Sequence, residues 1–130
     1  RHGVALLFDA HSIQSEVPRF FDGRLTDFNL GTAAGDSADE ALAQGLLAVC
    51  EGADAYSSVL NGRFTGGYIT RRHGKPADAV HAVQLELSQA TYMNEEPPFS
   101  YRDDLADAVR PVLKKLLAKM LDWLETAKSC

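Results

Sequence analysis

The chain has 130 residues, of which 45% are hydrophobic and 24% charged, a composition typical of a soluble globular domain and not of a disordered or fibrous protein. Its 13 Lys and Arg against 18 Asp and Glu give a net charge of −5, which excludes nucleic acid as the expected main partner. The longest apolar run, residues 4–8, is too short to cross a bilayer and follows no charged-then-apolar leader, so we expect neither a membrane span nor a signal peptide.

The first predicted element is a strand over residues 3–10. Its apolar run lacks alternation, which is typical of a strand buried on both faces of a parallel or mixed sheet, so we expect a central strand. Because the chain enters this strand at once and lacks an initiator Met, we interpret it as the later part of a longer protein. Residues 12–35 are polar and interrupted by Pro and Gly, and they predict a long structured loop of a kind that is often functional.

A helix is predicted next. Ser37, followed three residues later by Glu40, has the pattern of a capping box at the start of a helix. Apolar residues then recur at helical spacing, and Gly52 ends the helix. Residues 57–60 predict a short strand, and the glycines of the segment 61–71 indicate close approach of the backbone to a neighbour or ligand.

The remaining elements are a helical turn, a strand and a closing helix. Pro76 favours the first position of a single helical turn over residues 76–81. Residues 82–88 alternate between apolar and polar, which predicts a strand. Helical spacing after Ser100 predicts a long helix, in which Pro111 indicates a kink or a short helix followed by a longer one. Helices and strands intermix along the chain, so the predicted fold class is α/β.

Cysteine usage indicates a reducing compartment. Cys50 and Cys130 are too few for a disulfide scaffold and lack the C-x-x-C spacing of zinc or redox sites. We expect Cys50, near the end of a helix, to be a small buried residue, and Cys130 to lie on a frayed tail. The expected location is therefore the cytoplasm.

The first candidate site lies at the end of the first strand. Asp9 and His11 are two residues apart, so they lie on the same side of the strand. The carboxyl ends of strands are where α/β proteins usually keep their sites, and a carboxylate beside an imidazole can bind a metal or transfer a proton. The alternative is a purely structural pair, in which the carboxylate caps the loop and hydrogen-bonds the imidazole.

Glu86 is the second candidate. It lies in the strand 82–88 and shares one face with Gln84 and Ser88. Glu is disfavoured inside strands and is rarely buried without a partner, so this carboxylate either faces solvent or has a function. Burial would raise its pKa toward the range useful to a general base.

The third candidate is a basic, Gly-rich segment. The guanidinium groups of Arg63 and Arg71 suit bidentate binding of carboxylates, and Gly66 with Gly67 would let a small anion approach the backbone. The alternative is a cluster of surface salt bridges. The segment has neither a phosphate-loop nor a G-x-G-x-x-G pattern.

Three motifs occur together and in order: FDAHS, NGRF-x-GGYITR and QLEL. By these motifs, and by its Leu-rich closing helix, the chain resembles the N-formylglutamate amidohydrolase (deformylase) family. The resemblance implies a zinc hydrolase with a mixed sheet flanked by helices, in a zinc-carboxypeptidase-like (phosphorylase/hydrolase-like) fold. It matches His11 to the last zinc ligand, with Asp9 beside it, and Glu86 to the glutamate that activates the zinc-bound water. The implied reaction is hydrolysis of N-formyl-L-glutamate to formate and L-glutamate, in histidine breakdown.

The dicarboxylate substrate implied by the family suggests further roles. Arg63 and Arg71 would each bind one carboxylate, Asn61 would be an additional donor, and Arg19 would stabilise the oxyanion. Catalytic zinc normally has three protein ligands, and here only His11 is identifiable.

Residues 1–130 are therefore expected to form the C-terminal part of a single domain. Alone, the chain should bind zinc weakly, be nearly inactive, and associate with itself or with the missing N-terminal half through an uncovered sheet edge. Two other interpretations stay open: a non-catalytic fragment that keeps only the anion pocket, and a deacylase of another N-acyl amino acid.

Overall fold

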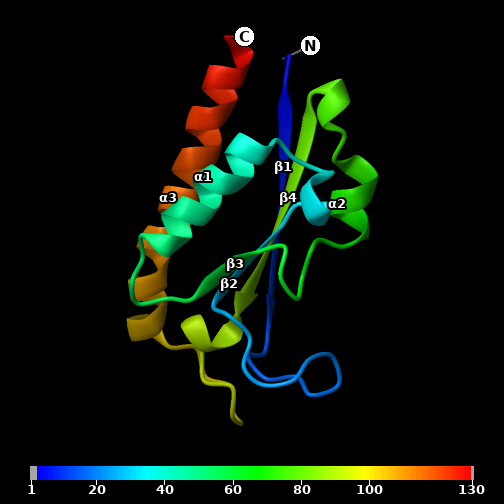
Figure 1. Ribbon diagram of the computed structural model, residues 1–130. Helices are drawn as coiled ribbons and strands as arrows, with labels where there is room; N and C mark the ends of the chain where they lie inside the picture. Colours follow the sequence, from blue (N-terminus) through cyan, green and yellow to red (C-terminus); the bar gives the residue numbers. More distant parts are fainter. Residues whose placement is uncertain (1–2, 130) are drawn as a thin grey trace.

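The computed structural model describes residues 3–129 (Figure 1). Its strands and helices, in chain order, are β1 (Ala5–Ile13), β2 (Phe28–Gly31), α1 (Glu40–Glu51), β3 (Ser58–Leu60), α2 (Tyr68–His73), β4 (Val80–Ser88) and α3 (Asp103–Lys128). Short 3₁₀ turns occupy Ala33–Gly35, Pro76–Asp78 and Gln89–Thr91. The α/β class and the helical turn at Pro76 are confirmed. No helix within residues 3–129 has both the length and the apolar character needed to span a membrane.

The four strands form one mixed sheet in the order β1-β4-β2-β3. β1 pairs with β4 in parallel, β4 pairs with β2 antiparallel, and β2 pairs with β3 in parallel. The expectation of a central first strand is wrong for this sheet, because β4 is the one strand among residues 3–129 that pairs with β1. β1 is half-buried or exposed along its length, not buried on both faces.

Helices α1 and α3 cover one face of the sheet, and α2 lies on the opposite side (Figure 1). Alternation along β4 points Val83, Leu85 and Leu87 into the core beneath α1 and α3. Leu42 of α1 and Leu116 of α3 are fully buried against them. Cys50 is a buried free thiol of this core, as expected, whereas Cys130 lies outside the described residues.

Two local expectations are corrected. β2 lies inside the segment predicted to be a loop; its four residues are all buried, so it shows no alternation to reveal a strand. α1 begins after Asp39, whose carboxylate accepts hydrogen bonds from the backbone N–H groups of Ala41 and Leu42. The Ser37 hydroxyl instead donates to the backbone oxygen of Ala82, which ties the start of this helix to β4.

The closing helix α3 is a single helix that runs through Pro111. Proline removes one backbone hydrogen bond from a helix and usually bends or breaks it. The buried residues Val109, Val112, Leu116 and Met120 continue on one stripe across the proline. Packing of this stripe on the sheet therefore keeps the two halves of α3 in one element.

Candidate functional site

His11 and Glu86 meet because β1 and β4 run parallel and in register. His11 is paired with Glu86, and Asp9 with Gln84. Since residues that share a face recur every second position, these four side chains lie on the face of the sheet away from α1 and α3. With Gly67, Tyr68 and Ile69 from the start of α2 they line a pocket of about 250 Å³. The sheet therefore brings together the first two candidate sites of the sequence.

Asp9 holds the imidazole of His11. Its Oδ1 atom lies 2.8 Å from Nε2 of His11. A carboxylate at this distance favours a proton on Nε2, which leaves Nδ1 with its lone pair. Ligating histidines are commonly oriented by such a bond from the other ring nitrogen, so the pair suits a histidine that binds a metal through Nδ1.

Glu86 is buried, with only 8% of its surface exposed, so the solvent-facing alternative is wrong. Its backbone oxygen is hydrogen-bonded to Asn29, whereas its carboxylate makes no hydrogen bond to another residue of the 3–129 range. Burial raises the pKa of this carboxyl, His11 partly offsets the rise, and Asp9 adds to it. A carboxyl with a raised pKa beside an imidazole is a better proton acceptor than an exposed carboxyl.

The Gly-rich segment forms one wall of the pocket. The backbone N–H of Gly67 donates to Oε1 of Gln84 at 2.8 Å, and this bond joins the segment to β4. A Cβ atom on Gly31 would lie 2.6 Å from the backbone carbon of Thr65, so β2 and the segment pack backbone to backbone. The segment does approach a neighbour closely, but the glycine that this backbone contact requires is Gly31 of β2 and not one of the glycines of segment 61–71. Sequence reasoning missed Gln84 and Gly31, although Gln84 lies two residues before Glu86 on the same face.

The two arginines lie outside this pocket. Arg63 donates to the backbone oxygen of Phe20 through Nε and Nη2. Arg71 donates through Nη1 to the backbone oxygen of Gly66 at 2.9 Å, and it lines a separate polar pocket of about 290 Å³ with Thr65 and Ser37. Both guanidinium groups therefore tether loops, and Arg71 also borders a cavity.

Asn61 and Arg19 also lie away from the pocket. Oδ1 of Asn61 accepts a hydrogen bond from the backbone N–H of Thr32 at 2.8 Å, and its Nδ2 donates to the Thr32 hydroxyl at 2.9 Å. Arg19 is exposed, and its guanidinium carbon lies 5.7 Å from the centre of the Phe20 ring. The structure thus groups Asp9, His11 and Glu86 and places the other predicted site residues elsewhere.

These donors fit zinc in chemical type but not in number. Zinc accepts imidazole nitrogen and carboxylate oxygen, which His11, Asp9 and Glu86 can supply. Residues 3–129 contain no group of three or more His, Cys, Asp or Glu arranged to hold a metal ion. A zinc site at His11 would therefore need donors other than those described.

Comparison with known proteins agrees with the motif resemblance. The family model described as N-formylglutamate amidohydrolase matches residues 1–93. An N-formylglutamate deformylase of Pseudomonas aeruginosa is 64% identical over 121 residues, which cover 93% of this chain and 46% of that protein. The deformylase of Pseudomonas putida is 60% identical over 121 residues, which cover 45% of its length. The chain therefore spans less than half the length of the curated relatives it matches.

A solved structure has the same fold. The crystal structure of an N-formylglutamate amidohydrolase from Ralstonia eutropha JMP134 superposes with a TM-score of 0.79 at 20% identity. The superposition covers 95% of this chain and 45% of that protein. At this identity the likeness supports the arrangement of strands and helices alone.

Proposed function

The chain belongs to the N-formylglutamate amidohydrolase family, and from this premise we propose that it takes part in hydrolysis of the formamide bond of N-formyl-L-glutamate, giving formate and L-glutamate. The observation that carries the proposal is the pairing of His11 with Glu86 across β1 and β4, with Asp9 on the imidazole. We further propose a role in histidine degradation and a cytoplasmic location, in keeping with the free thiol of Cys50.

Glu86 is the proposed proton carrier. In formamide hydrolysis the oxygen of a water attacks the formyl carbon, the carbon–nitrogen bond breaks, and one water proton ends on the leaving nitrogen. A carboxylate in the pocket can take that proton and deliver it to the nitrogen. The raised pKa of Glu86 supports this assignment. A higher pKa makes the carboxylate a better acceptor of the water proton, which it then delivers to the leaving nitrogen.

We propose zinc as the cofactor, with Nδ1 of His11 as one ligand and Asp9 orienting the imidazole. A bound zinc would polarise the formyl oxygen and lower the pKa of water. The remaining zinc ligands would come from outside the described residues, in a region such as the part of the longer relatives that this chain does not match.

Substrate binding is proposed for the arginines, foremost Arg71. One of its terminal nitrogens bonds Gly66, and its other donors bond no described residue, so they are available to a carboxylate. Asn61 would bind the substrate by giving up its contacts to Thr32, whereas Arg63 holds Phe20 through Nε and Nη2 and has Nη1 free of described partners. Arg19, on the exposed loop, remains the proposed oxyanion donor.

In a polypeptide as long as the curated relatives, we propose that the free edge of β1 contacts the additional part of the chain. On the α3 side of β1 lies a groove of about 460 Å³, lined largely by apolar residues of β1, β4 and α3. Leu117 in this groove is 47% exposed, and Leu121, one turn further along α3, is 62% exposed. An unpaired strand edge beside exposed leucines favours addition of a strand and an apolar helix face.

Formate release from N-formyl-L-glutamate by the complete gene product tests the function. Glu86→Gln should lower kcat by about 10²-fold or more, since it removes the proton carrier. Glu125→Gln makes the same change at an exposed position of α3 and is the control. Near-normal turnover of Glu86→Gln would refute the assigned role.

Two further measurements separate the alternatives. A panel of N-formyl and N-acetyl amino acids decides between deformylase and another deacylase. Metal analysis of the same protein decides against the non-catalytic interpretation if zinc copurifies.

A further inference from the structure

Asn29 of β2 is the antiparallel partner of Glu86. Directly opposed residues of an antiparallel pair point to the same face of a sheet, so Asn29 lies beside Glu86 on the side of the candidate site. Glu86 is thus flanked by His11 on one strand and Asn29 on the other.

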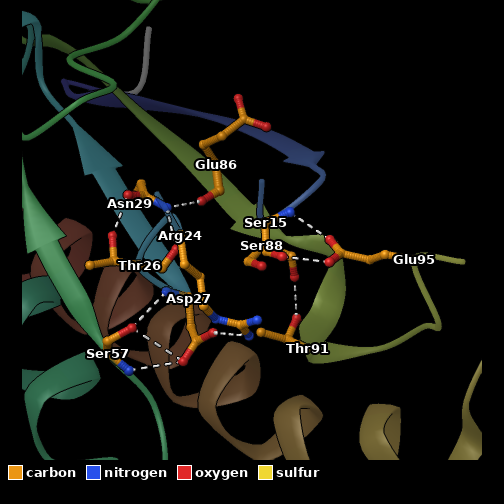
Figure 2. Close-up of polar contacts among 10 residues, drawn as sticks. All are labelled: Ser15, Arg24, Thr26, Asp27, Asn29, Ser57, Glu86, Ser88, Thr91 and Glu95. Atoms are coloured by element: carbon orange, nitrogen blue, oxygen red, sulfur yellow. Dashed lines mark hydrogen bonds and ion pairs between the residues drawn. The ribbon is translucent and has the colours of Figure 1, made fainter. Parts of the chain in front are cut away.

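The amide of Asn29 is buried, with 1% of the residue exposed, and fully engaged. Its Nδ2 donates to the backbone oxygen of Glu86 at 2.9 Å and to that of Thr26 at 2.8 Å. Its Oδ1 accepts from the Thr26 hydroxyl. Figure 2 shows the carbonyl oxygen of Glu86 turned toward Asn29 and its carboxylate directed away. A buried amide with every hydrogen engaged has one favourable orientation, so it fixes the groups it touches.

Thr26 extends this contact to the end of the long loop after β1. Asp27, the next residue, accepts hydrogen bonds on its carboxylate from the backbone N–H and hydroxyl of Ser57 (Figure 2). Its backbone oxygen accepts from the N–H of Ser88. The end of the loop is therefore attached to β4 at two points: Asn29 bonds the backbone of Glu86, and Asp27 bonds the backbone of Ser88.

We propose that Asn29 is a positioning residue for Glu86: its amide holds the Glu86 backbone and the end of the loop in one arrangement, so that the carboxylate stands at the reacting bond. This inference rests on the proposed function, because it concerns the position of the Glu86 carboxylate, the proposed proton carrier. It adds a residue that does not line the pocket and that lies in the segment predicted to be a loop.

Asn29→Ala in the complete gene product should lower kcat for formate release about 10- to 100-fold with little change in KM, because small displacements of a catalytic group cost up to this much. Asn29→Asp should be at least as harmful, since it directs a carboxylate oxygen at the backbone oxygens of Glu86 and Thr26. Thr26→Ala keeps the bond between Asn29 and Glu86 but removes the hydroxyl that donates to Oδ1 of Asn29. This variant should fold more readily than Asn29→Ala and should lose less of kcat.

The deciding measurement is a double-mutant cycle of Asn29→Ala with Glu86→Asp. The second change keeps the carboxylate but shortens the side chain by one methylene. If Asn29 acts through Glu86, the 10- to 100-fold loss shrinks to a few-fold in the Glu86→Asp background, where the carboxylate is already displaced. Ser57→Ala is the control: it touches Asp27 in the same network but not Glu86, and its effect should be equal in both backgrounds.

Equal losses from Asn29→Ala in the two backgrounds, or an unchanged kcat, overturn the inference. If Asn29→Ala does not fold, the same comparison is made with Thr26→Ala, and equal losses there overturn it as well. Full turnover of Glu86→Asp and Glu86→Gln alike would instead refute the role of Glu86, which separates failure of the proposed function from failure of this inference.

Discussion

Glu95 and Ser15, 80 residues apart, are joined by two hydrogen bonds: the carboxylate of Glu95 accepts from both the backbone N–H and the hydroxyl of Ser15 (Figure 2). Ser15 is 2% exposed and stands at the start of the loop that follows β1. One carboxylate therefore anchors the beginning of this loop, as Asn29 and Asp27 anchor its end.

Glu95→Ala should free the beginning of this loop. The buried N–H of Ser15 loses its acceptor, at a cost of about 1–3 kcal/mol of unfolding free energy. We expect faster tryptic cleavage after Arg19 and Arg24, measured under native conditions by mass spectrometry. Glu96→Ala changes an exposed neighbour and is the control. Equal cleavage rates in the two variants would contradict the anchoring role.

Asn61→Ala should destabilise the fold by about 2 kcal/mol in urea denaturation, because the backbone N–H of Thr32 loses its acceptor. Asn61 also has φ +52°, a conformation that Asn adopts more readily than Ala. Asn61→Asp keeps the acceptor, and the Thr32 hydroxyl can turn to donate to it, so it should lose less than half as much. Unchanged stability with a raised KM would instead support direct substrate binding by Asn61.

His81 should make stability depend on pH. It is buried, its Nδ1 accepts a hydrogen bond from the backbone N–H of Asp39 at 3.0 Å, and its ring packs edge-on against Trp123. Burial lowers its pKa, with the Asp39 carboxylate opposing. The unfolded chain therefore binds the proton first, and stability falls as the pH drops from about 6.5, the ordinary value of His, through the lower folded pKa.

Urea denaturation at pH 7.5 and 5.5 measures this dependence. His81→Asn keeps an acceptor near Nδ1 but does not titrate, so it should remove most of the difference between the two pH values. An identical difference in wild type and His81→Asn would show that other groups cause it.

Leu117→Glu and Leu121→Glu test the groove beside β1. In the 130-residue chain both should reduce self-association in sedimentation velocity without loss of stability, because these side chains are exposed. In the complete gene product they should lower the melting temperature, since the groove is proposed to be covered there. Ala118→Glu adds the same charge at an adjacent exposed position of α3 and should have neither effect.

Local patterns in the sequence were sufficient to predict some features. The alternation of residues 82–88 predicts a core face and a polar face, and β4 has both. The two-residue spacing of Asp9 and His11 predicts a shared side, and the two groups are 2.8 Å apart. The helical spacing after Ser100 predicts the apolar stripe of α3, although Pro111 indicates a kink or two helices where the structure has one. Side-chain period along one element decides each of these, so no knowledge of neighbouring elements is needed.

Only the tertiary structure decides which elements become neighbours. The parallel pairing of β1 with β4, more than 60 residues later, places His11 beside Glu86, and the antiparallel pairing with β2 places Asn29 on its other side. The same packing puts Arg63 and Arg71 on loop carbonyls outside the pocket and leaves β1 at an edge. Strand order and register depend on burial and hydrogen bonding between distant segments, which no local pattern contains. The residue types of the candidate site are thus readable in the sequence, whereas their assembly around Glu86 is a property of the sheet.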